Sequence, residues 1–517
     1  MSSLATLRAL HATIGNALQD IERIYTAKDL DYPSLDIPFY QSDVSATDTS
    51  EEKLKQADAE KLAADPKIMQ ASSLIVAACG QLVASVHHPF FTAAIEGVQL
   101  GEVTAALSVL EASHTVEILR DAGPQGLHIN ELARKVDQIR LGEEAASTND
   151  IEHLDPVKFG HVLRLLASQH ILREVQPNVF ANNRLSSILD TGKSLESLMN
   201  EPTKKYDETN GASAFIAMSS SELFRSIAYF KDWLLPSADQ PKKPDTPFNV
   251  ALNTNEQYYT WLERPENSVR LMQVSRAMAA ASKTEGSKSI ADSSVFPWET
   301  LPQNSVVVDV GGGIGAVSVQ LATPHPHLRL IVQDRAQTVE IAPKIWGDAH
   351  KELFDSGRVS FQVQDFFEPQ PASLEVPGVG QVQHPSAYIV TRVMHNWPDA
   401  ECKKILRNLR AAAGSDTKLI LHEVVLPLAC TDASSAASEI KGAAGMTAPT
   451  NSALLPNFGK AAICGYLVDI MMMTMMNSRE RTLEEMREMV LDAGWKIVSV
   501  DLSSPPIAWG YLVAVPV

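Results

Sequence analysis

The stretch Val306-Val-Val-Asp-Val-Gly-Gly-Gly-Ile-Gly315 ends an apolar, β-branched run with an acidic residue and continues into a glycine-rich turn. Glycines let the main chain turn sharply and approach a ligand closely, while a helix can start directly behind them. The stretch therefore predicts a strand, a ligand-binding loop and a helix. One such loop does not identify the ligand, because Gly311, Gly313 and Ala316 also satisfy a relaxed dinucleotide-binding pattern.

Apolar runs of the same kind continue beyond this loop and alternate with helical segments. In chain order they read LRLIVQD, VSFQVQD, AYIVT, KLILHEVVLP and WKIVSVDLS. Such alternation predicts an α/β fold, a doubly wound Rossmann-like domain with a mainly parallel sheet, which we place at residues 301–517. Residues 431–457 interrupt the pattern, and their Ala, Ser and Thr content predicts a flexible loop.

The sequence before this domain has helical spacing and divides into three segments. Residues 1–122 form a helical region that contains a polar linker after residue 28. In residues 123–235, two helical stretches precede Ile171–Phe180, where a Pro-Asn turn predicts a hairpin, and this order indicates a winged helix. Residues 236–300 start with a Pro/Lys-rich joint and continue as a helical connector that we expect to contribute to a substrate pocket.

Composition limits the partners that the chain can have. Its 517 residues carry 44 Lys and Arg against 62 Asp and Glu, a formal net charge of −18 without a long basic run. Binding to nucleic acid through phosphate neutralisation is therefore not expected, even with a winged helix. The four cysteines lack metal-ligand spacing, and no metal site is predicted. Neither a signal-peptide layout nor a membrane-spanning apolar run is predicted, so we expect a cytoplasmic protein without a membrane segment.

Acidic residues at successive strand ends favour S-adenosylmethionine over a dinucleotide. Asp309 precedes the glycines, where its carboxylate would repel a pyrophosphate and can face the cofactor's amino-acid end. Asp334 ends the next strand and can accept both ribose hydroxyls, which either cofactor class needs. After the third strand, Asp365 offers a carboxylate to the adenine amino group and Phe366 offers a ring to the adenine face.

Six motifs then occur in a fixed order: VVDVGGGIGA, QD, QDFFE, RVMHNWPDAECKKIL, LHEVVLP and NSRERT. Together they resemble the S-adenosylmethionine-dependent O-methyltransferases of the caffeic-acid type, in particular the fungal small-molecule branch, over most of the chain. The resemblance implies a class I methyltransferase domain behind a helical dimerisation domain, in which the winged helix supports a homodimer and encloses substrate. It also implies a small phenolic or polyketide-like secondary metabolite as the methyl acceptor.

The resemblance assigns the chemistry to the stretch Arg392–Asp399, RVMHNWPD. A phenol with a pKa of about 10 is a poor nucleophile, and a base that takes its proton adds about 10²–10⁴ in rate. By family match His395 is that general base, Glu423 holds its imidazole, and Glu480 is a second flanking carboxylate. The residue after the base is usually aspartate, so Asn396 departs from the pattern.

Other positions carried over from the family stay open. Four residues before the base, a Lys or Arg often contacts the cofactor, but here the position is Thr391 and Arg392 follows it, so either can serve. Family position suggests Met278, Met472 and Met476 for the substrate pocket. The run MMMTMM at 471–476 is equally typical of core packing on a helix.

Three further functions compete with methyl transfer. The main alternative is a pericyclase or another non-methylating enzyme that binds the same cofactor on the same scaffold. Enzymes of that kind have lost the catalytic histidine, so His395 beside two glutamates favours methyl transfer. A nicotinamide oxidoreductase does not need the His-Asn-Trp motif, and a winged-helix regulator does not need the glycine loop.

Overall fold

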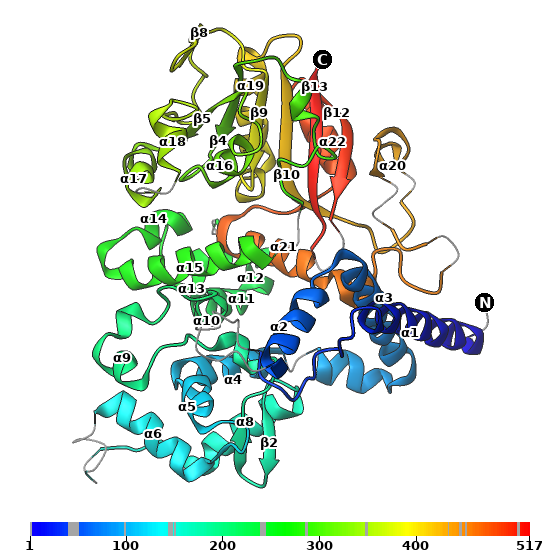
Figure 1. Cartoon of the computed structure of the whole chain (residues 1–517), viewed down its shortest axis with the longest axis vertical. Coiled ribbons are helices and arrows are strands. Elements are labelled where there is room, and N and C mark those ends of the chain that lie inside the picture. The colour runs from blue at the N-terminus through cyan, green and yellow to red at the C-terminus, as the bar shows by residue number, and fades with distance from the viewer. Residues whose placement is uncertain are drawn as a thin grey trace. The chain divides into compact units, whose positions relative to one another are not determined.

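The computed structural model describes residues 3–39, 51–97, 100–142, 148, 151–237, 245–284, 288–346, 350–432, 434–443, 447–449, 452–503 and 507–517. The chain forms two compact parts, which Figure 1 shows with labelled elements. The sheet unit comprises Met1–Leu10, Val76–Gln81 and Glu285–Val517, and the helical unit comprises His11–Ile75 and Leu82–Thr284. The sheet unit thus includes residues 285–300, which the sequence places in the connector.

The first helices pack through small and aromatic apolar residues. They are α1 (Ser3–Thr26), α2 (Glu51–Ala63), α3 (Pro66–Val86), the π-helix η1 (Phe91–Glu96), α4 (Leu100–Ala112) and α5 (Thr115–Ala122). Ile21 and Tyr25 of α1 are buried against Ala59 and Ile68, and the Tyr25 hydroxyl donates to the Ala59 carbonyl at 2.9 Å. Asp65 caps α3 by accepting from the Lys67 amide.

Residues 123–235 contain the two helices and the hairpin that the sequence predicts, together with a short strand, β1, that it does not predict. Strand β1 (Leu127–His128) precedes α6 (Ile129–Leu141) and α8 (Pro156–Ser168), and β2 (Arg173–Gln176) and β3 (Val179–Ala181) follow. The strands form an antiparallel sheet in the order β1-β3-β2. Asn178 makes the hairpin turn with a φ of 62°, a conformation that asparagine tolerates.

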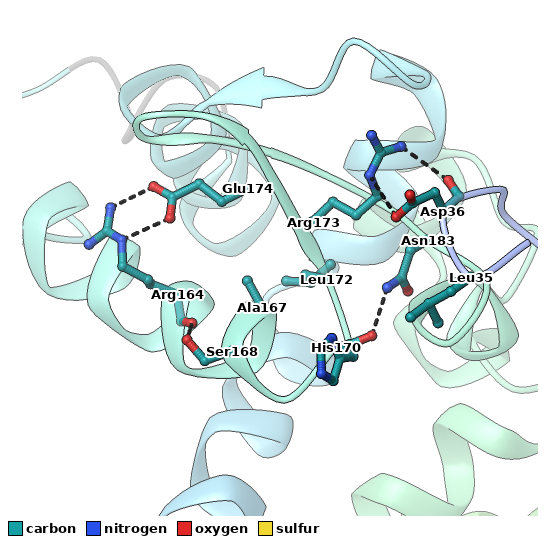
Figure 2. A pocket seen from close by; sticks show the side chains of 10 residues that line it. All are labelled: Leu35, Asp36, Arg164, Ala167, Ser168, His170, Leu172, Arg173, Glu174 and Asn183. Carbon is teal, nitrogen blue, oxygen red and sulfur yellow. Dashed lines mark hydrogen bonds and ion pairs between the residues drawn. The ribbon is translucent and has the colours of Figure 1, made fainter. Parts of the chain in front are cut away.

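A pocket of about 390 Å³ lies beside this hairpin (Figure 2). Its charged groups are paired within the helical unit. Arg164 meets Glu174 at 2.7 Å, and Arg173 meets Asp36 at 3.3 Å. Both guanidinium groups are therefore paired with acids of the same unit, and none of the predicted site residues lines this pocket.

Short helices complete the chain up to residue 284. They are η2 (Ser186–Leu189), α9 (Leu195–Asn200), η3 (Pro202–Lys204), α10 (Ala212–Met218), η4 (Ser219–Leu223), α11 (Phe224–Ile227), α12 (Phe230–Leu234), α13 (Pro247–Ala251), α14 (Tyr258–Leu262), η5 (Pro265–Asn267) and α15 (Ser268–Thr284). Met278 lies on α15, within the helical unit.

The sheet unit is built on an eight-stranded sheet in the order β12-β13-β10-β9-β4-β5-β6, with β11 pairing to β10. Its strands are β4 (Ser305–Val310), β5 (Leu328–Asp334), β6 (Val359–Val363), β9 (Ala387–Thr391), β10 (Lys418–Leu426), β11 (Arg481–Thr482), β12 (Trp495–Leu502) and β13 (Trp509–Pro516). The five strands β4, β5, β6, β9 and β10 run parallel, while β13 is antiparallel to both neighbours. The predicted Rossmann-like fold is confirmed, although the sequence reading missed β13.

Helices lie beside this sheet, as Figure 1 shows for α16 to α19. The remaining elements are η6 (Trp298–Thr300), α16 (Ala316–Ala322), α17 (Ala336–Trp346), α18 (Lys351–Asp355), the hairpin β7 (Leu374–Val376) and β8 (Gly380–Val382), η7 (Met394–Asn396), α19 (Asp399–Ala412), α20 (Ser435–Glu439), η9 (Gly459–Ala462), α21 (Ile463–Met476) and α22 (Leu483–Asp492). Alternating residues of β4 enter two separate cores: Val308 packs with residues of α19 and α22, and Val307 packs with Val319 of α16.

Two sequence predictions need correction here. Residues 431–457 are not wholly a loop, because α20 lies within them and Lys441 bridges to Ser499 of β12. Residues 433, 444–446 and 450–451 of this insertion fall outside the described part of the chain. The sequence also predicts no apolar run long enough to cross a membrane, but Pro66–Val86 and Gly459–Met476 are both long and apolar enough to do so. Core helices of soluble proteins pass the same test.

Candidate active site

The predicted site residues gather at the carboxyl ends of the parallel strands. Asp309 is the penultimate residue of β4, Asp334 ends β5 and Thr391 ends β9. Thr391 pairs in register with His422 of β10, so Glu423 lies one residue further along at the same edge. Open α/β sheets bind their ligands at this edge, where loops leave the strands.

The glycine loop has a shape that side chains would obstruct. Gly311, Gly313 and Gly315 have φ values of 67°, 58° and 85°. A Cβ on Gly311 would lie 2.9 Å from Val393 Cγ2, whereas one on Gly313 would meet nothing within 4 Å. The loop is therefore packed against the turn that carries His395 at Gly311 and is open at Gly313.

Asp334 fixes this loop by hydrogen bonds to the main chain. Its Oδ2 accepts from the Gly313 amide at 2.9 Å, and its Oδ1 accepts from the Arg335 amide at 2.8 Å. A carboxylate oxygen has a second lone pair, so these bonds leave capacity for the ribose hydroxyls that the sequence assigns to Asp334.

Asp309 packs against Gly312 of the loop and is fully buried. Ser318 Oγ donates to its Oδ2 at 2.8 Å, while Oδ1 has no hydrogen-bond partner among the described residues. Burial, with a smaller contribution from the charge of Asp334, raises the pKa of Asp309 to about 6. A positively charged ligand group near the loop would favour the ionised form of this acid.

Asp365 and Phe366 lie beyond β6, where the sequence places the adenine. Asp365 is exposed, and its Oδ1 accepts from the Phe367 amide at 2.9 Å. The Phe366 ring lies beside Gly311 and makes an edge contact with the ring of Phe367. An adenosine cofactor with a charged amino-acid tail fits this arrangement. The glycine loop is open at Gly313, Asp334 ends β5, and Asp365 and Phe366 follow β6.

Thr391 and Arg392 are the two candidates for the cofactor contact near the base, and their surroundings differ. Arg392 has a φ of 55°, unusual for a residue with a long side chain, and its amide donates to the His422 carbonyl at 2.9 Å. Its guanidinium lies 4.9 Å from the ring of Trp509, a cation–π distance. The Thr391 hydroxyl is buried without a hydrogen-bond partner among the described residues, so either residue can still serve as the cofactor contact.

His395 lies on the short helix η7 and is oriented by Glu480. Its Nδ1 is 2.9 Å from Glu480 Oε1, and the glutamate side chain is fully buried. Burial opposes a charge on the imidazole. The hydrogen bond and charge of Glu480 and the charge of Glu423 outweigh that effect and raise the pKa of His395.

Glu423 contacts the main chain of this turn, which differs from the predicted hydrogen bond to the imidazole. Its Oε1 accepts from the amides of Val393 at 3.0 Å and Met394 at 2.8 Å. Burial raises the pKa of Glu423. Ligand-type atoms of His395, Glu423 and Glu480 lie within 4.8 Å of one another, so the three groups form one cluster.

His422, the neighbouring histidine, is not equipped to be a base. Its ring stacks on Tyr511 at 4.0 Å between centroids. Burial, followed by the charges of Arg392 and His395, lowers the pKa of His422 to about 3. It would therefore bind a proton far more weakly than His395 at neutral pH.

The predicted substrate residues are only partly accounted for. Met472 of α21 is buried and Met476 is half-buried, while Met278 belongs to the helical unit and is 38% exposed. Asp469 lies on the same face of α21 as Met472 and Met476, and its Oδ1 accepts from the Glu480 amide at 2.9 Å. The hydrogen bond between Asp469 and the Glu480 amide was not predicted from the sequence.

The strand order, the glycine loop and the acids at the strand ends define a class I methyltransferase. A model of the O-methyltransferase domain matches residues 242–447. The chain is 33% identical to an O-methyltransferase of Armillaria gallica over 520 residues, which cover 99% of this chain and 100% of that protein. It is 32% identical to a 4-O-methyltransferase 1 of Phanerochaete chrysosporium, with 96% of this chain and 95% of that protein covered.

The chain therefore belongs to the O-methyltransferase family and is an S-adenosylmethionine-dependent O-methyltransferase. A solved structure of a pericyclic reaction enzyme matches with a TM-score of 0.59 at 17% identity, covering 89% of this chain and 100% of that one. At this identity the likeness concerns the fold alone. The fold thus accommodates both chemistries, and the side chains at the site must distinguish them.

Proposed function

We propose that the protein methylates a phenolic hydroxyl of a small secondary metabolite and that His395 is the general base. One observation carries the proposal: the 2.9 Å contact between His395 Nδ1 and the buried Glu480 carboxylate. An ionised Glu480 accepts a hydrogen bond from the Nδ1–H group, so Nε2 is left as the basic nitrogen. The ring is thereby held in the tautomer that can remove a proton.

S-adenosylmethionine supplies an electrophilic methyl group. His395 Nε2 would take the phenol proton as the phenol oxygen attacked the methyl carbon, with the cofactor sulfur as the leaving group. The raised pKa of His395 strengthens the base, and Glu480 stabilises the imidazolium that forms. The side chains of Glu423 and Glu480 keep the base in place.

An apolar acceptor is supported by the surroundings of Glu480. Asp469, which binds the Glu480 amide, shares its helix face with Met472, Met473 and Met476. Methionine side chains adapt to flat apolar ligands and make favourable contacts with aromatic rings. A planar phenol is the hydroxyl compound that such a face suits.

Transfer of a labelled methyl group tests the function. The protein is incubated with methyl-labelled S-adenosylmethionine and a panel of phenols, and His395→Ala should lower the transfer rate by about 10²–10⁴. The matched control is His161→Ala, which alters an exposed histidine of α8. Cofactor binding without transfer to any phenol would favour the non-methylating alternative, and undiminished transfer by His395→Ala would contradict the assignment of the base.

We further propose a homodimer, in keeping with the family. Exposed apolar side chains extend from the end of α3 to the first residue of α4. They are Val83, Val86, Phe90, Phe91 and Leu100, each at least 48% exposed. Exposed apolar surface of this kind marks association sites. Light scattering on the purified protein should give twice the mass of one chain, and a monomer at micromolar concentration would contradict this proposal.

A further inference from the structure

Arg481 is a fully buried arginine directly after Glu480. Its main chain belongs to β11, which pairs with β10 so that Arg481 is opposite Val425, two residues beyond Glu423. A buried guanidinium is costly unless its charge and its donors are satisfied. Its partners therefore show what the residue holds in place.

The guanidinium of Arg481 binds an acid and the turn that carries His395. Its Nε and Nη2 both donate to Asp399 Oδ1, at 2.9 and 2.7 Å. Its Nη1 donates to the Met394 carbonyl at 3.1 Å, and its Nη2 donates to the Trp397 carbonyl at 2.9 Å. These carbonyls lie on either side of His395.

Other side chains hold the remaining main-chain groups of the same turn. The Ser478 hydroxyl donates to the His395 carbonyl at 2.5 Å. Cys402 Sγ donates to the carbonyls of Met394 at 3.1 Å and Trp397 at 3.3 Å. With Glu423 on the amides of Val393 and Met394, the turn is fixed by hydrogen bonds from both directions.

We propose that Arg481 is a positioning residue for methyl transfer: by binding the carbonyls of Met394 and Trp397 it holds His395 against Glu480. This inference rests on the proposed function of His395 and identifies the Arg481 guanidinium as the group that keeps the imidazole in position beside Glu480. Glu480 and Arg481 are adjacent in the chain, so one short segment supplies both the carboxylate that contacts the ring and the cation that holds the turn.

Lysine cannot replace this arrangement. The planar guanidinium directs separate N–H groups to Asp399 and to two carbonyls, whereas an ammonium is a single compact charge. Asp399 is 43% exposed on its side chain and also pairs with Arg479 at 3.0 Å. Arg479 binds Asp399 and Glu485 through its side chain, so it is a neighbouring arginine with the same counter-ion.

The test compares Arg481→Lys with the matched control Arg479→Lys by two readouts. NMR titration of labelled histidines, with the His395 signal assigned from the His395→Ala spectrum, reports the base without any methyl transfer. Kinetics then give kcat, KM and their pH dependence for a phenol. Arg481→Lys should move the His395 midpoint to lower pH, because a looser turn weakens the hydrogen bond to Glu480 that raises its pKa. It should also lower kcat by about 10²-fold at an unchanged cofactor Kd.

Arg479→Lys should leave both readouts at their wild-type values. If Arg481→Lys does not fold, Asp399→Asn decides by the same readouts, because it removes the counter-ion of Arg481 at a partly exposed position. A wild-type midpoint and kcat in a folded Arg481→Lys or Asp399→Asn protein would overturn the proposal. Absence of methyl transfer in the wild type would instead refute the proposed function, while the titration still decides whether Arg481 positions His395.

Discussion

The two ends of the site are built in different ways. At the cofactor end, Asp309, the glycine loop and Asp334 follow directly from β4 and β5, and their contacts are largely between residues at neighbouring strand ends. At the base end, His395 is held by Glu423, Glu480 and Arg481, which lie on other segments of the chain. The first end is encoded locally, whereas the second depends on the completed fold.

Among the two glutamates, the loop glycines and Ser478, the largest effect is expected at Glu480, where Glu480→Gln alters the contact with the imidazole. Removal of the charge weakens the hydrogen bond to the imidazole that raises the pKa of His395, so kcat should fall about 10²-fold. A base must be neutral to act, so the rate of the wild type should decline as the pH falls through a pKa above 6.5. In the variant this decline should move to lower pH. Glu488→Gln, at an exposed position on α22, is the control, and a pH profile identical to wild type in Glu480→Gln would contradict this account.

Glu423 should respond differently from Glu480, because it contacts main-chain amides. Glutamine keeps an oxygen that can accept from Val393 and Met394, so Glu423→Gln should retain kcat within about threefold, whereas Glu423→Ala should lose about tenfold or more. Steady-state kinetics of the pair distinguish the two roles. Equal losses in both variants would show that the charge of Glu423, not its main-chain contacts, matters.

At the cofactor end, Gly311→Ala should weaken S-adenosylmethionine binding by about tenfold. The alanine would adopt a left-handed conformation that costs about 1–2 kcal/mol, and its Cβ would press on Val393 at 2.9 Å. Gly313→Ala has the same backbone strain but open space around the Cβ, and serves as the comparison. Calorimetric titration with the cofactor measures both, and equal affinities for the two variants would show that contact with the base turn is unimportant.

The smallest effect is expected from Ser478→Ala, which removes one hydrogen bond to the His395 carbonyl. A single neutral hydrogen bond contributes about 0.5–1.5 kcal/mol, and the other contacts of the turn remain. The free energy of unfolding should fall by about that amount, as measured in urea, and kcat should change by less than about fivefold. A loss as large as that of Glu480→Gln would mean that the turn is held mainly by Ser478.

The same contrast explains what the sequence could predict. The glycine loop, Asp334 and the strands around them follow from local patterns, because spacing along the chain fixes their geometry. The motif order located His395 and its glutamates, but the partner of each glutamate depends on packing between β10, η7 and β11. For the same reason Glu423 was assigned to the ring, and the contact between Arg481 and Asp399 was not predicted. Strand β13 was missed. Helix α20 was missed as well, since a short helix in an Ala/Ser-rich insertion has little signal of its own.

The central claim is that His395 removes the phenol proton, and the acidity of the acceptor tests it most directly. Methyl transfer by wild type and His395→Ala is compared for an ordinary phenol, with a pKa of about 10, and for a nitro-substituted phenol that is already ionised at neutral pH. We predict a loss of about 10²–10⁴ with the ordinary phenol and a much smaller loss with the ionised one, because the latter needs no base. Equal losses with both acceptors would contradict the claim and would assign His395 to binding.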